Sequence, residues 1–346
     1  MKYAVVTFGC RVNQADSVGI ERQLRALGGR VVSPEDADLV VVNTCSVTAT
    51  ADHGARQTIR RIARTNPGVR IVATGCYATR APLDFTKLPA VTDVVDNSDK
   101  HQLIACLKLE HENPTAQRFG EGDGPCGKTI QPGTAGRTGY TLRVQTGCDE
   151  TCSYCIIPST RGVGRSVPLA HVLAELDEVA AAGFKEVSVT GVHLGSYGRD
   201  LGPGCTLQDL LRLFDTHRST LYFRLSSLEP MDCGPDVVDL VARSGRFAPH
   251  FHLPLQHASD RILRAMRRPY TSEYYRRLVS GIRERLPHAG LGSDVIVGFP
   301  GETDEDIDSV ERVGEGPSRS VDRELLLVEV HALLAPLVDH ATAIAE

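Results

Sequence analysis

The sequence predicts an α/β protein in which an N-terminal parallel sheet precedes a second domain of repeated strand–helix units. Near-continuous runs of β-branched residues alternate with helix-like segments, which is typical of parallel sheets. A polar stretch rich in glycine and proline interrupts this alternation between residues 107 and 138. The length of 346 residues also suits about two domains.

The first domain, assigned to residues 1–106, alternates expected strands and helices. Strands are predicted for 3–8, 38–43 and 69–74, and helices for 16–27 and 51–65. The first helix stops at Gly28-Gly29, a C-terminal capping signal. The second stops before Asn66-Pro67-Gly68, a turn signal. Residues 107–138 are assigned to a linker.

The alternation resumes in the second domain, assigned to residues 139–313. Strands are predicted for 140–145, 186–190, 222–226, 250–255 and 291–297, with helices that include 169–182 and 272–286. Repeated βα units of this kind favour a barrel or partial barrel. Residues 314–346 differ, and we expect an acidic tail there, with an amphipathic helix over 321–346 broken by Pro336.

Composition excludes several classes of protein. The 41% of apolar residues argues against wholesale disorder. No run approaches the roughly 18 apolar residues of a membrane span, and no signal peptide is recognised at the N-terminus, so we expect a cytoplasmic protein. Ten cysteines are too few for a secreted disulfide scaffold. Clustered cysteines in a reducing compartment favour metal binding or catalysis.

The net charge of −5 hides an uneven distribution. From Asp304 to Glu346 there are 11 acidic residues and 3 arginines, which leaves the preceding body at +3. Arginines gather in 56–70 and again in 261–285, where tyrosines are interleaved. Arginine with aromatic side chains suits an RNA backbone and its bases. A solvated helix face explains the same charges equally well.

One cysteine set is local in sequence. Cys148, Cys152 and Cys155 form a Cys-x3-Cys-x2-Cys loop after a predicted strand. Three thiolates can hold three irons of a [4Fe–4S] cluster and leave the fourth iron open for a ligand. A zinc site and a chance cluster are the alternatives, but structural zinc sites have four ligands, often in paired knuckles.

The other cysteine set is dispersed. Cys10, Cys45 and Cys76 each follow a predicted strand directly. The carboxyl ends of parallel strands share one edge of the sheet, so these three thiols are expected to converge and to hold a second cluster. Glycine before Cys10 and before Cys76 permits a tight turn. Three unrelated buried cysteines are the alternative. Cys106, Cys126, Cys205 and Cys233 fit neither set and are expected to be structural.

These residues resemble two families, one nested in the other. The Cys148 loop resembles that of the radical S-adenosylmethionine (SAM) superfamily, with Tyr154 at the usual aromatic position. Over about residues 1–312 the chain resembles the methylthiotransferases. The matching motifs are Thr7–Gln14, Asn43–Thr48, Arg56–Arg61, Val72–Tyr77, the Cys148 loop, Arg224–Pro230, His252–Gln256, Met266–Thr271 and Asp294–Thr303.

The resemblance implies a flavodoxin/Rossmann-like domain with an auxiliary [4Fe–4S] cluster on Cys10, Cys45 and Cys76. It also implies a radical-SAM partial (β/α) barrel whose cluster, held by the Cys148 loop, binds SAM. Such enzymes replace a C–H bond by C–S–CH3 and use no catalytic side chain beyond the cluster ligands. The implied cofactors are two [4Fe–4S] clusters and S-adenosyl-L-methionine.

Further residues are expected around SAM, with local turn or capping roles as the alternative. Gly191 follows a strand and permits close approach of backbone to a ligand. Arg165 suits a carboxylate. Ser227, Glu229 and Gln256 also follow strands. His193 and His252 are possible ligands or acids, but a hydrogen-bonded structural role is favoured.

Within the family, Arg11–Gln14, Thr44–Thr48 and the Arg56–Arg61 helix look most like the MtaB branch. That branch modifies C2 of N6-threonylcarbamoyladenosine beside the tRNA anticodon. Branches acting on isopentenyladenosine or on a ribosomal protein remain alternatives. The implied partners are the tRNA anticodon stem-loop and an electron donor such as flavodoxin or ferredoxin. We expect a monomer with no membrane contact.

The resemblance ends at Val313. The family continues into a last barrel strand and a TRAM domain that grips tRNA, in place of which we expect the acidic tail. An incomplete barrel leaves an apolar strand edge, which Leu325–Leu327 and Leu333–Leu337 are candidates to cover. A truncated, poorly active protein that still binds iron–sulfur clusters and SAM is therefore the other functional interpretation.

Overall fold

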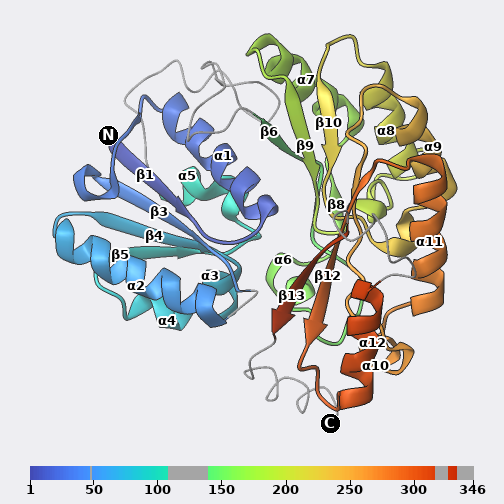
Figure 1. Ribbon diagram of the computed structural model, residues 1–346. Helices are drawn as coiled ribbons and strands as arrows, with labels where there is room; N and C mark the ends of the chain where they lie inside the picture. The colour runs from blue at the N-terminus through green and yellow to red at the C-terminus, as the bar shows by residue number, and fades with distance from the viewer. Residues whose placement is uncertain (47–48, 108–138, 316–325, 333–346) are drawn as a thin grey trace. The chain divides into compact units, whose positions relative to one another are not determined.

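The computed structural model describes residues 1–46, 49–107, 139–315 and 326–332 of the chain (Figure 1). The chain divides into two compact units, of which the first comprises residues 1–130 and 156–162 and the second residues 131–155 and 163–346. The short segment Ile156–Gly162, which the sequence placed in the second domain, thus groups with the first unit.

Unit 1 is built around a five-stranded sheet in the order β2-β1-β3-β4-β5, in which every pairing is parallel. Its strands are β1 (Lys2–Thr7), β2 (Arg30–Val31), β3 (Leu39–Thr44), β4 (Arg70–Gly75) and β5 (Val91–Val95). Its helices are α1 (Arg11–Ala26), α2 (Ala49–Thr65), α3 (Cys76–Arg80), α4 (Pro82–Thr86), α5 (Leu103–Cys106) and α6 (Ile157–Arg161). This strand order is that of flavodoxin-like folds.

Helices cover both faces of this sheet (Figure 1). The central strand β3 explains this arrangement, because its successive residues pack into apolar clusters on opposite faces of the sheet. Val40 and Val42 pack with residues of α2, α3 and α4, whereas Leu39 and Val41 pack with residues of α1 and α5. Side chains of a strand alternate between faces, so a continuous apolar run can fill both cores, and β3 is buried throughout.

Unit 2 contains six parallel strands that follow one another in chain order. They are β6 (Tyr140–Arg143), β9 (Glu186–Thr190), β10 (Tyr222–Leu225), β11 (His250–His252), β12 (Gly290–Val297) and β13 (Leu326–Ala332). Ladders join β6 to β9 to β10 and β11 to β12 to β13, and bridges at Phe223–Phe247 and Ser227–His252 connect the two sets. The result is the expected partial barrel.

The helices of unit 2 connect these strands on the outside of the sheet (Figure 1). They are α7 (Leu169–Ala181), α8 (Leu207–Thr216), α9 (Pro235–Arg243), α10 (Asp260–Ala265), α11 (Ser272–Arg285) and α12 (Asp304–Glu315). α8 begins at a capping box between Thr206 and Asp209, and its residues Leu207, Leu210, Leu211 and Phe214 are buried, as amphipathic spacing predicts. A short hairpin, β7 (Gln145–Thr146) with β8 (Arg165–Ser166), flanks the Cys148 loop.

The fold class and the named strands and helices of both domains are confirmed, with ends that differ by a few residues. The prediction for the C-terminal tail is not confirmed. The helix expected over 321–346 is wrong for residues 326–332, which form β13 and pair with β12 along their full length. The expectation that no barrel strand follows β12 is wrong for the same reason. The segment Val328-Glu-Val-His-Ala332 alternates apolar and polar residues, a strand period, and β12 offers it a parallel edge.

Several expectations lie outside the described residues, including the linker over 108–138, Cys126 within it, and the tail beyond Ala332. None of the described helices is long and apolar enough to cross a membrane.

Gly75 ends β4 with φ of +98°, and a Cβ built there would lie 2.2 Å from the carbonyl oxygen of Thr44. We expect Gly75→Ala to lower the free energy of unfolding of unit 1 by about 2 kcal/mol or more, because the backbone is strained and the neighbouring strand must move. The measurement is urea unfolding of the apoprotein followed by circular dichroism. Gly68→Ala is the control, since nothing lies within 4 Å of its Cβ. Equal unfolding midpoints for the two variants would contradict the prediction.

Candidate iron–sulfur and cofactor sites

Three cysteines lie at the carboxyl edge of the sheet in unit 1. Cys10 follows the loop after β1, Cys45 follows β3 directly, and Cys76 begins α3 directly after β4. These three strands are neighbours in the sheet. The chain leaves β1 on one side of the sheet and β3 on the other, so the site lies at the topological switch point where α/β sheets bind ligands. Cys45 and Cys76 are buried and Cys10 is exposed.

The glycines before two of these cysteines have the role that the sequence predicted. Gly9 has φ of +88°, and a Cβ built there would lie 2.4 Å from Sγ of Cys45. The thiol of Cys45 thus lies directly over the backbone that leads into Cys10. Only glycine permits this approach at a positive φ.

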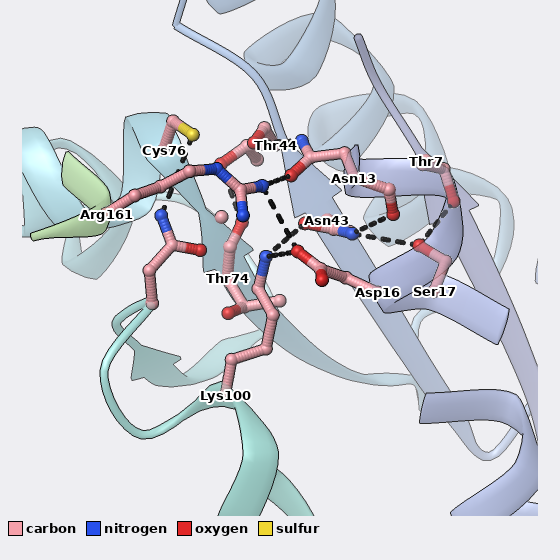
Figure 2. Close-up of polar contacts among 12 residues, drawn as sticks. Thr7, Asn13, Asp16, Ser17, Asn43, Thr44, Thr74, Cys76, Lys100 and Arg161 are labelled. Atoms are coloured by element: carbon pink, nitrogen blue, oxygen red, sulfur yellow. Dashed lines mark hydrogen bonds and ion pairs between the residues drawn. The ribbon is translucent and has the colours of Figure 1, made fainter. Parts of the chain in front are cut away.

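Two buried asparagines bind the loops that carry these cysteines (Figure 2). Nδ2 of Asn13, in the first turn of α1, donates to the carbonyl oxygens of Phe8 at 2.9 Å and of Thr44 at 2.8 Å. Nδ2 of Asn43 donates to the carbonyl oxygen of Asn13 at 2.8 Å and to Oγ of Ser17 at 2.9 Å. The loops after β1 and β3 are therefore held in one hydrogen-bonded arrangement.

A charged cluster lies beside this arrangement (Figure 2). Oδ2 of Asp16 accepts from Nζ of Lys100 at 3.0 Å and from Nη2 of Arg161 at 3.1 Å. Nζ of Lys100 also donates to Oδ1 of Asn43 at 3.0 Å, and Nη2 of Arg161 donates to Oδ1 of Asn13 at 2.5 Å. The three charged side chains are 8% exposed or less. They join α1, the segment after β5 and α6.

Burial and neighbouring negative charges act in opposite directions on the pKa values of Lys100 and Arg161. Burial lowers the pKa of Lys100, and the carboxylate of Asp16 only partly offsets it. Burial also acts to lower the pKa of Arg161, but Asp16 and the charges of Cys76 and Cys10 outweigh it and raise that pKa. The guanidinium of Arg161 therefore lies within electrostatic reach of two of the three cysteines.

No three histidine, cysteine, aspartate or glutamate side chains in the described part of the chain lie close enough to share a single metal ion. A four-iron cluster takes each cysteine on a different iron, so its ligands lie farther apart than those of one ion. The residues present fit such a cluster, because three cysteines face one edge and a buried cation faces Cys10 and Cys76. Thiolate ligands bring negative charge that this cation balances.

The second cysteine set lies in the loop between β7 and α6. Sγ of Cys148 accepts a hydrogen bond from the backbone N–H of Glu150 at 3.4 Å. Sγ of Cys152 accepts one from Nη1 of Arg268 at 3.1 Å, and the backbone N–H of Cys155 donates to the carbonyl of Cys152 at 3.1 Å. Burial raises the pKa of Cys152, while Arg268 acts against that rise. A thiolate ligand here is therefore supported by a charged donor.

Two ion pairs support this loop within unit 2. Nδ1 of His193 lies 3.7 Å from Sγ of Cys148, and its Nε2 lies 2.7 Å from Oδ2 of Asp232. Burial acts to lower the pKa of His193, but the contacts with Asp232 and Cys148 raise it to about 10. Arg268 pairs with Glu229. Burial raises the pKa of Glu229, although the positive charge of Arg268 acts to lower it. Nε2 of His252 lies within hydrogen-bond distance of Oδ1 of Asp294, at 3.1 Å. The preference for hydrogen-bonded histidines is confirmed.

Most residues expected around SAM follow barrel strands, at the end where such barrels carry their active sites. Gly191 follows β9, and a Cβ there would lie 3.1 Å from Oε1 of Gln145, so the backbone at Gly191 lies close to a neighbouring side chain and its expected role toward SAM stays a prediction. Ser227 follows β10, and its Oγ lies 2.7 Å from Nδ1 of His252. Gln256 follows β11 with φ of +67°, a strained conformation of the kind found at ligand sites.

Two other expected residues lie closer to the cysteine loop. Tyr154 packs against the cluster of Ile262, Met266 and Ile296, and burial raises the pKa of its hydroxyl strongly. Arg165 is exposed and lies in β8, paired with Thr146 of β7.

The sequence missed four charged residues of these sites, namely Asp16, Lys100, Arg161 and Arg268. Arg161 opens the motif Arg161-Gly-Val-Gly-Arg165, from which only Arg165 was selected. Arg268 belongs to the second arginine group, which the sequence associated with RNA, but it is 7% exposed and contacts Cys152. Other members pair with carboxylates, such as Arg285 with Asp239 at 2.7 Å. Arg268 therefore does not belong to an exposed arginine patch, and RNA contact by the exposed members of the group stays a prediction.

Two family models match the chain. The uncharacterized protein family UPF0004 matches residues 2–96, and the radical SAM superfamily matches residues 142–313. The threonylcarbamoyladenosine tRNA methylthiotransferase MtaB of Aquifex aeolicus is 39% identical over 312 residues, which are 88% of this chain and 75% of that protein. The chain belongs to the radical SAM methylthiotransferases of the MtaB type.

Other methylthiotransferases are similar at comparable levels. MtaB of Bacillus subtilis is 35% identical, over 87% of this chain and 67% of that protein. The tRNA-2-methylthio-N(6)-dimethylallyladenosine synthase of Syntrophomonas wolfei is also 35% identical, over 90% of this chain and 73% of that protein. This methylthiotransferase is thus an enzyme whose family uses SAM and carries two [4Fe–4S] clusters.

Solved structures agree on the fold. The radical SAM methyltransferase TsrM of Kitasatospora setae, with cobalamin and a [4Fe–4S] cluster bound, matches with a TM-score of 0.63 and 16% identity, over 96% of this chain and 72% of that chain. The cobalamin-dependent enzyme OxsB matches with a TM-score of 0.61 and 12% identity, over 99% of this chain and 54% of that chain. These likenesses show a fold shared with radical SAM enzymes.

The buried Arg268–Glu229 pair is expected to be strongly coupled. Arg268→Met and Glu229→Gln should each destabilise the apoprotein by about 3 kcal/mol, since each leaves a buried charge without its counterion. The double variant should recover about 1–3 kcal/mol of that stability. Urea unfolding of the four proteins gives this coupling.

The matched control is the exposed Arg277–Glu273 pair on α11, at 3.0 Å. Its coupling should stay below about 0.5 kcal/mol. Similar coupling energies for the two pairs would show that burial does not strengthen the Arg268–Glu229 interaction.

Proposed function

We propose that this chain is a tRNA methylthiotransferase that converts C2–H of N6-threonylcarbamoyladenosine at position 37 into C2–S–CH3. The observation that carries the proposal is the presence of two cysteine triplets, one at the carboxyl ends of parallel strands in unit 1 and one in the loop after β7 in unit 2. Two such triplets match a reaction that needs both a radical generator and a sulfur carrier.

Cys148, Cys152 and Cys155 are the proposed ligands of the cluster that binds SAM. When bound there, such a cluster would supply the electron that cleaves SAM, and a donor such as flavodoxin or ferredoxin would replace that electron. Arg268 and His193 support the ligand thiolates through the contacts with Cys152 and Cys148. Because both cations are themselves paired with carboxylates, they hold fixed positions before the cofactor binds.

SAM is proposed to lie along the carboxyl ends of β9, β10 and β11. Gly191 leaves room there for close approach, and Ser227 and Gln256 present polar groups from the following loops. Glu229 orients Arg268, and Tyr154 anchors the cysteine loop to an apolar cluster of Ile262, Met266 and Ile296. Arg165 at the β7–β8 hairpin suits the SAM or substrate carboxylate as an exposed guanidinium.

Cys10, Cys45 and Cys76 are the proposed ligands of the auxiliary cluster, which carries the sulfur that is transferred. The site lies at the switch point of a flavodoxin-like sheet. The hydrogen bonds of Asn13 to the carbonyls of Phe8 and Thr44 keep the loops of Cys10 and Cys45 in a common arrangement. This order reduces the entropy cost when the ligands gather around the irons.

The choice of substrate rests on the relatives. Four of the similar proteins, at 32–39% identity, carry the name threonylcarbamoyladenosine tRNA methylthiotransferase. Four more, at 33–35% identity, are named for dimethylallyladenosine tRNA. Together with the MtaB-like motifs around Cys10 and Cys45, these identities favour threonylcarbamoyladenosine. Dimethylallyladenosine tRNA is the second candidate because its enzymes are so similar.

The test is anaerobic reconstitution with iron and sulfide, followed by SAM, dithionite and tRNA that carries threonylcarbamoyladenosine. Mass spectrometry of the digested nucleosides is expected to show the methylthio product, with about eight irons per chain for two four-iron clusters. Cys45→Ala should retain about four irons and form no product. Cys106→Ala is the matched control, since Cys106 is an exposed cysteine in the same unit, and should keep both iron and product.

The outcomes separate the candidates. Product only from dimethylallyladenosine tRNA overturns the substrate and retains the enzyme class. Full iron content with no product from either tRNA overturns the activity of this chain and supports the poorly active interpretation. About four irons in the wild-type protein overturns the assignment of one cysteine triplet.

The exposed arginines of α2 are the proposed tRNA contacts in unit 1. Arg60 and Arg64 are exposed, whereas Arg61 lies 3.6 Å from Glu35. Replacing Arg60 and Arg64 by Gln is expected to weaken tRNA binding. The slope of log K against log[salt] should fall by about 1 for each phosphate that the variant no longer neutralises. Filter binding across a salt series measures both values.

The control for this prediction is Arg218→Gln, since Arg218 is highly exposed but belongs to unit 2 and pairs with Asp177. A salt slope that is the same in the wild-type protein and in the double variant would remove α2 from the interface.

A further inference from the structure

The charged cluster of unit 1 draws its members from three distant parts of the chain. Asp16 lies on α1, Lys100 follows β5, and Arg161 ends α6 (Figure 2). Nζ of Lys100 and Nη2 of Arg161 lie 3.0 and 3.1 Å from the same carboxylate oxygen. The side chains of all three groups are almost fully buried, and two basic groups share one carboxylate.

A buried positive charge is costly unless an anion compensates it. Here the carboxylate of Asp16 is shared by Lys100 and Arg161. The nearby groups that become anionic on binding iron are the thiols of Cys10 and Cys76, which act on the guanidinium of Arg161. Cys76 also acts on the ammonium of Lys100.

Further contacts fix Arg161 relative to the cysteines. Nδ2 of Asn97 donates to the carbonyl oxygen of Thr160 at 2.8 Å and lies 3.6 Å from Sγ of Cys76, so one amide joins α6 to that thiol. On the other side, Nη2 of Arg161 donates to Oδ1 of Asn13. The same Asn13 binds the backbone of the loops that lead to Cys10 and Cys45. Arg161 is thus connected to all three cysteine loops through two asparagines.

We propose that Arg161 and Lys100 are positioning residues that set the charge at the auxiliary cluster and stabilise its reduced form. This inference rests on the proposed role of Cys10, Cys45 and Cys76 as cluster ligands. The step is the transfer of one electron from a low-potential donor, dithionite in the test, to the cluster, with no bond formed or broken. Each added electron lowers the cluster charge by one, and a fixed buried cation stabilises that state and raises the reduction potential.

The test uses the full-length chain with Cys148→Ala, Cys152→Ala and Cys155→Ala, so that only the auxiliary cluster forms. Its reduction by dithionite is followed by electron paramagnetic resonance at controlled potentials. Adding Arg161→Gln or Lys100→Gln should lower the ratio of reduced to oxidised cluster at least tenfold at a given potential, which is a shift of about 59 mV for one electron. Arg161→Lys keeps the charge and should restore most of the ratio.

Arg30→Gln is the matched control, because Arg30 is exposed and begins β2 beside Lys2, at the opposite edge of the sheet from the cysteines. Its potential should equal that of the parent. Unchanged potentials in both Arg161→Gln and Lys100→Gln, with full iron content, overturn the inference. Iron absent from Arg161→Gln but retained in Arg161→Lys, with unchanged circular dichroism, supports it. If Arg161→Gln does not fold, the potential of Lys100→Gln decides.

The triple-alanine parent protein is itself a test, because it forms a cluster only if the ligand assignment is right. A parent that binds no cluster overturns the ligand assignment of Cys10, Cys45 and Cys76, and the inference falls with it. A full cluster in the parent with unchanged potentials in the charge variants leaves the ligand assignment standing and overturns the role of the cations alone.

Discussion

Parallel strand pairing is the constraint on which both candidate sites depend. Every ladder in the five-stranded sheet and in the six-stranded partial barrel is parallel, so the strands of each of these two assemblies end at one edge. Cys10, Cys45 and Cys76 are far apart in the chain, and shared strand direction alone brings them to one edge. In the barrel, parallel strands likewise bring the Cys148 loop and Gly191 to one edge. Neither site therefore requires a long ordered loop, and helices on the sheet faces hold the strand ends in position.

Electrostatics then distinguishes these cysteines from ordinary buried thiols. Cys233 shows the contrast, because burial raises its pKa to about 12 and the neighbouring carboxylate of Asp232 adds to that effect. Cys152 is also partly buried, but Arg268 donates to its sulfur and opposes the rise in pKa. In unit 1 the guanidinium of Arg161 faces Cys10 and Cys76. Several of the proposed ligands, Cys152 and Cys76 among them, thus lie near buried cations, which stabilise the thiolate that binds iron.

The sequence predicted what depends on neighbouring residues along the chain. β-branched runs indicated the strands, glycine before Cys10 and Cys76 indicated the turns, and spacing indicated both cysteine sets. Lys100 and Arg161 were missed because their partner Asp16 lies 84 and 145 residues away, and no local pattern marks such pairs. The prediction failed at 326–332 because the leucine-rich tail was interpreted with a helical period. The neighbouring edge of β12 decided the outcome there, and tertiary pairing commonly overrides such local preference.

The position of Arg161 in the chain adds a further step. α6 begins two residues after Cys155 and belongs to unit 1, where Asn97 holds Thr160 and Asp16 holds Arg161. A segment anchored at one end has fewer conformations to lose when its other end binds a ligand. The contacts that bring Arg161 to the auxiliary site therefore also restrict the chain next to Cys155. α6 thus carries a buried cation near Cys76 and begins two residues after Cys155, so one short helix adjoins both cysteine sets, one in space and one along the chain.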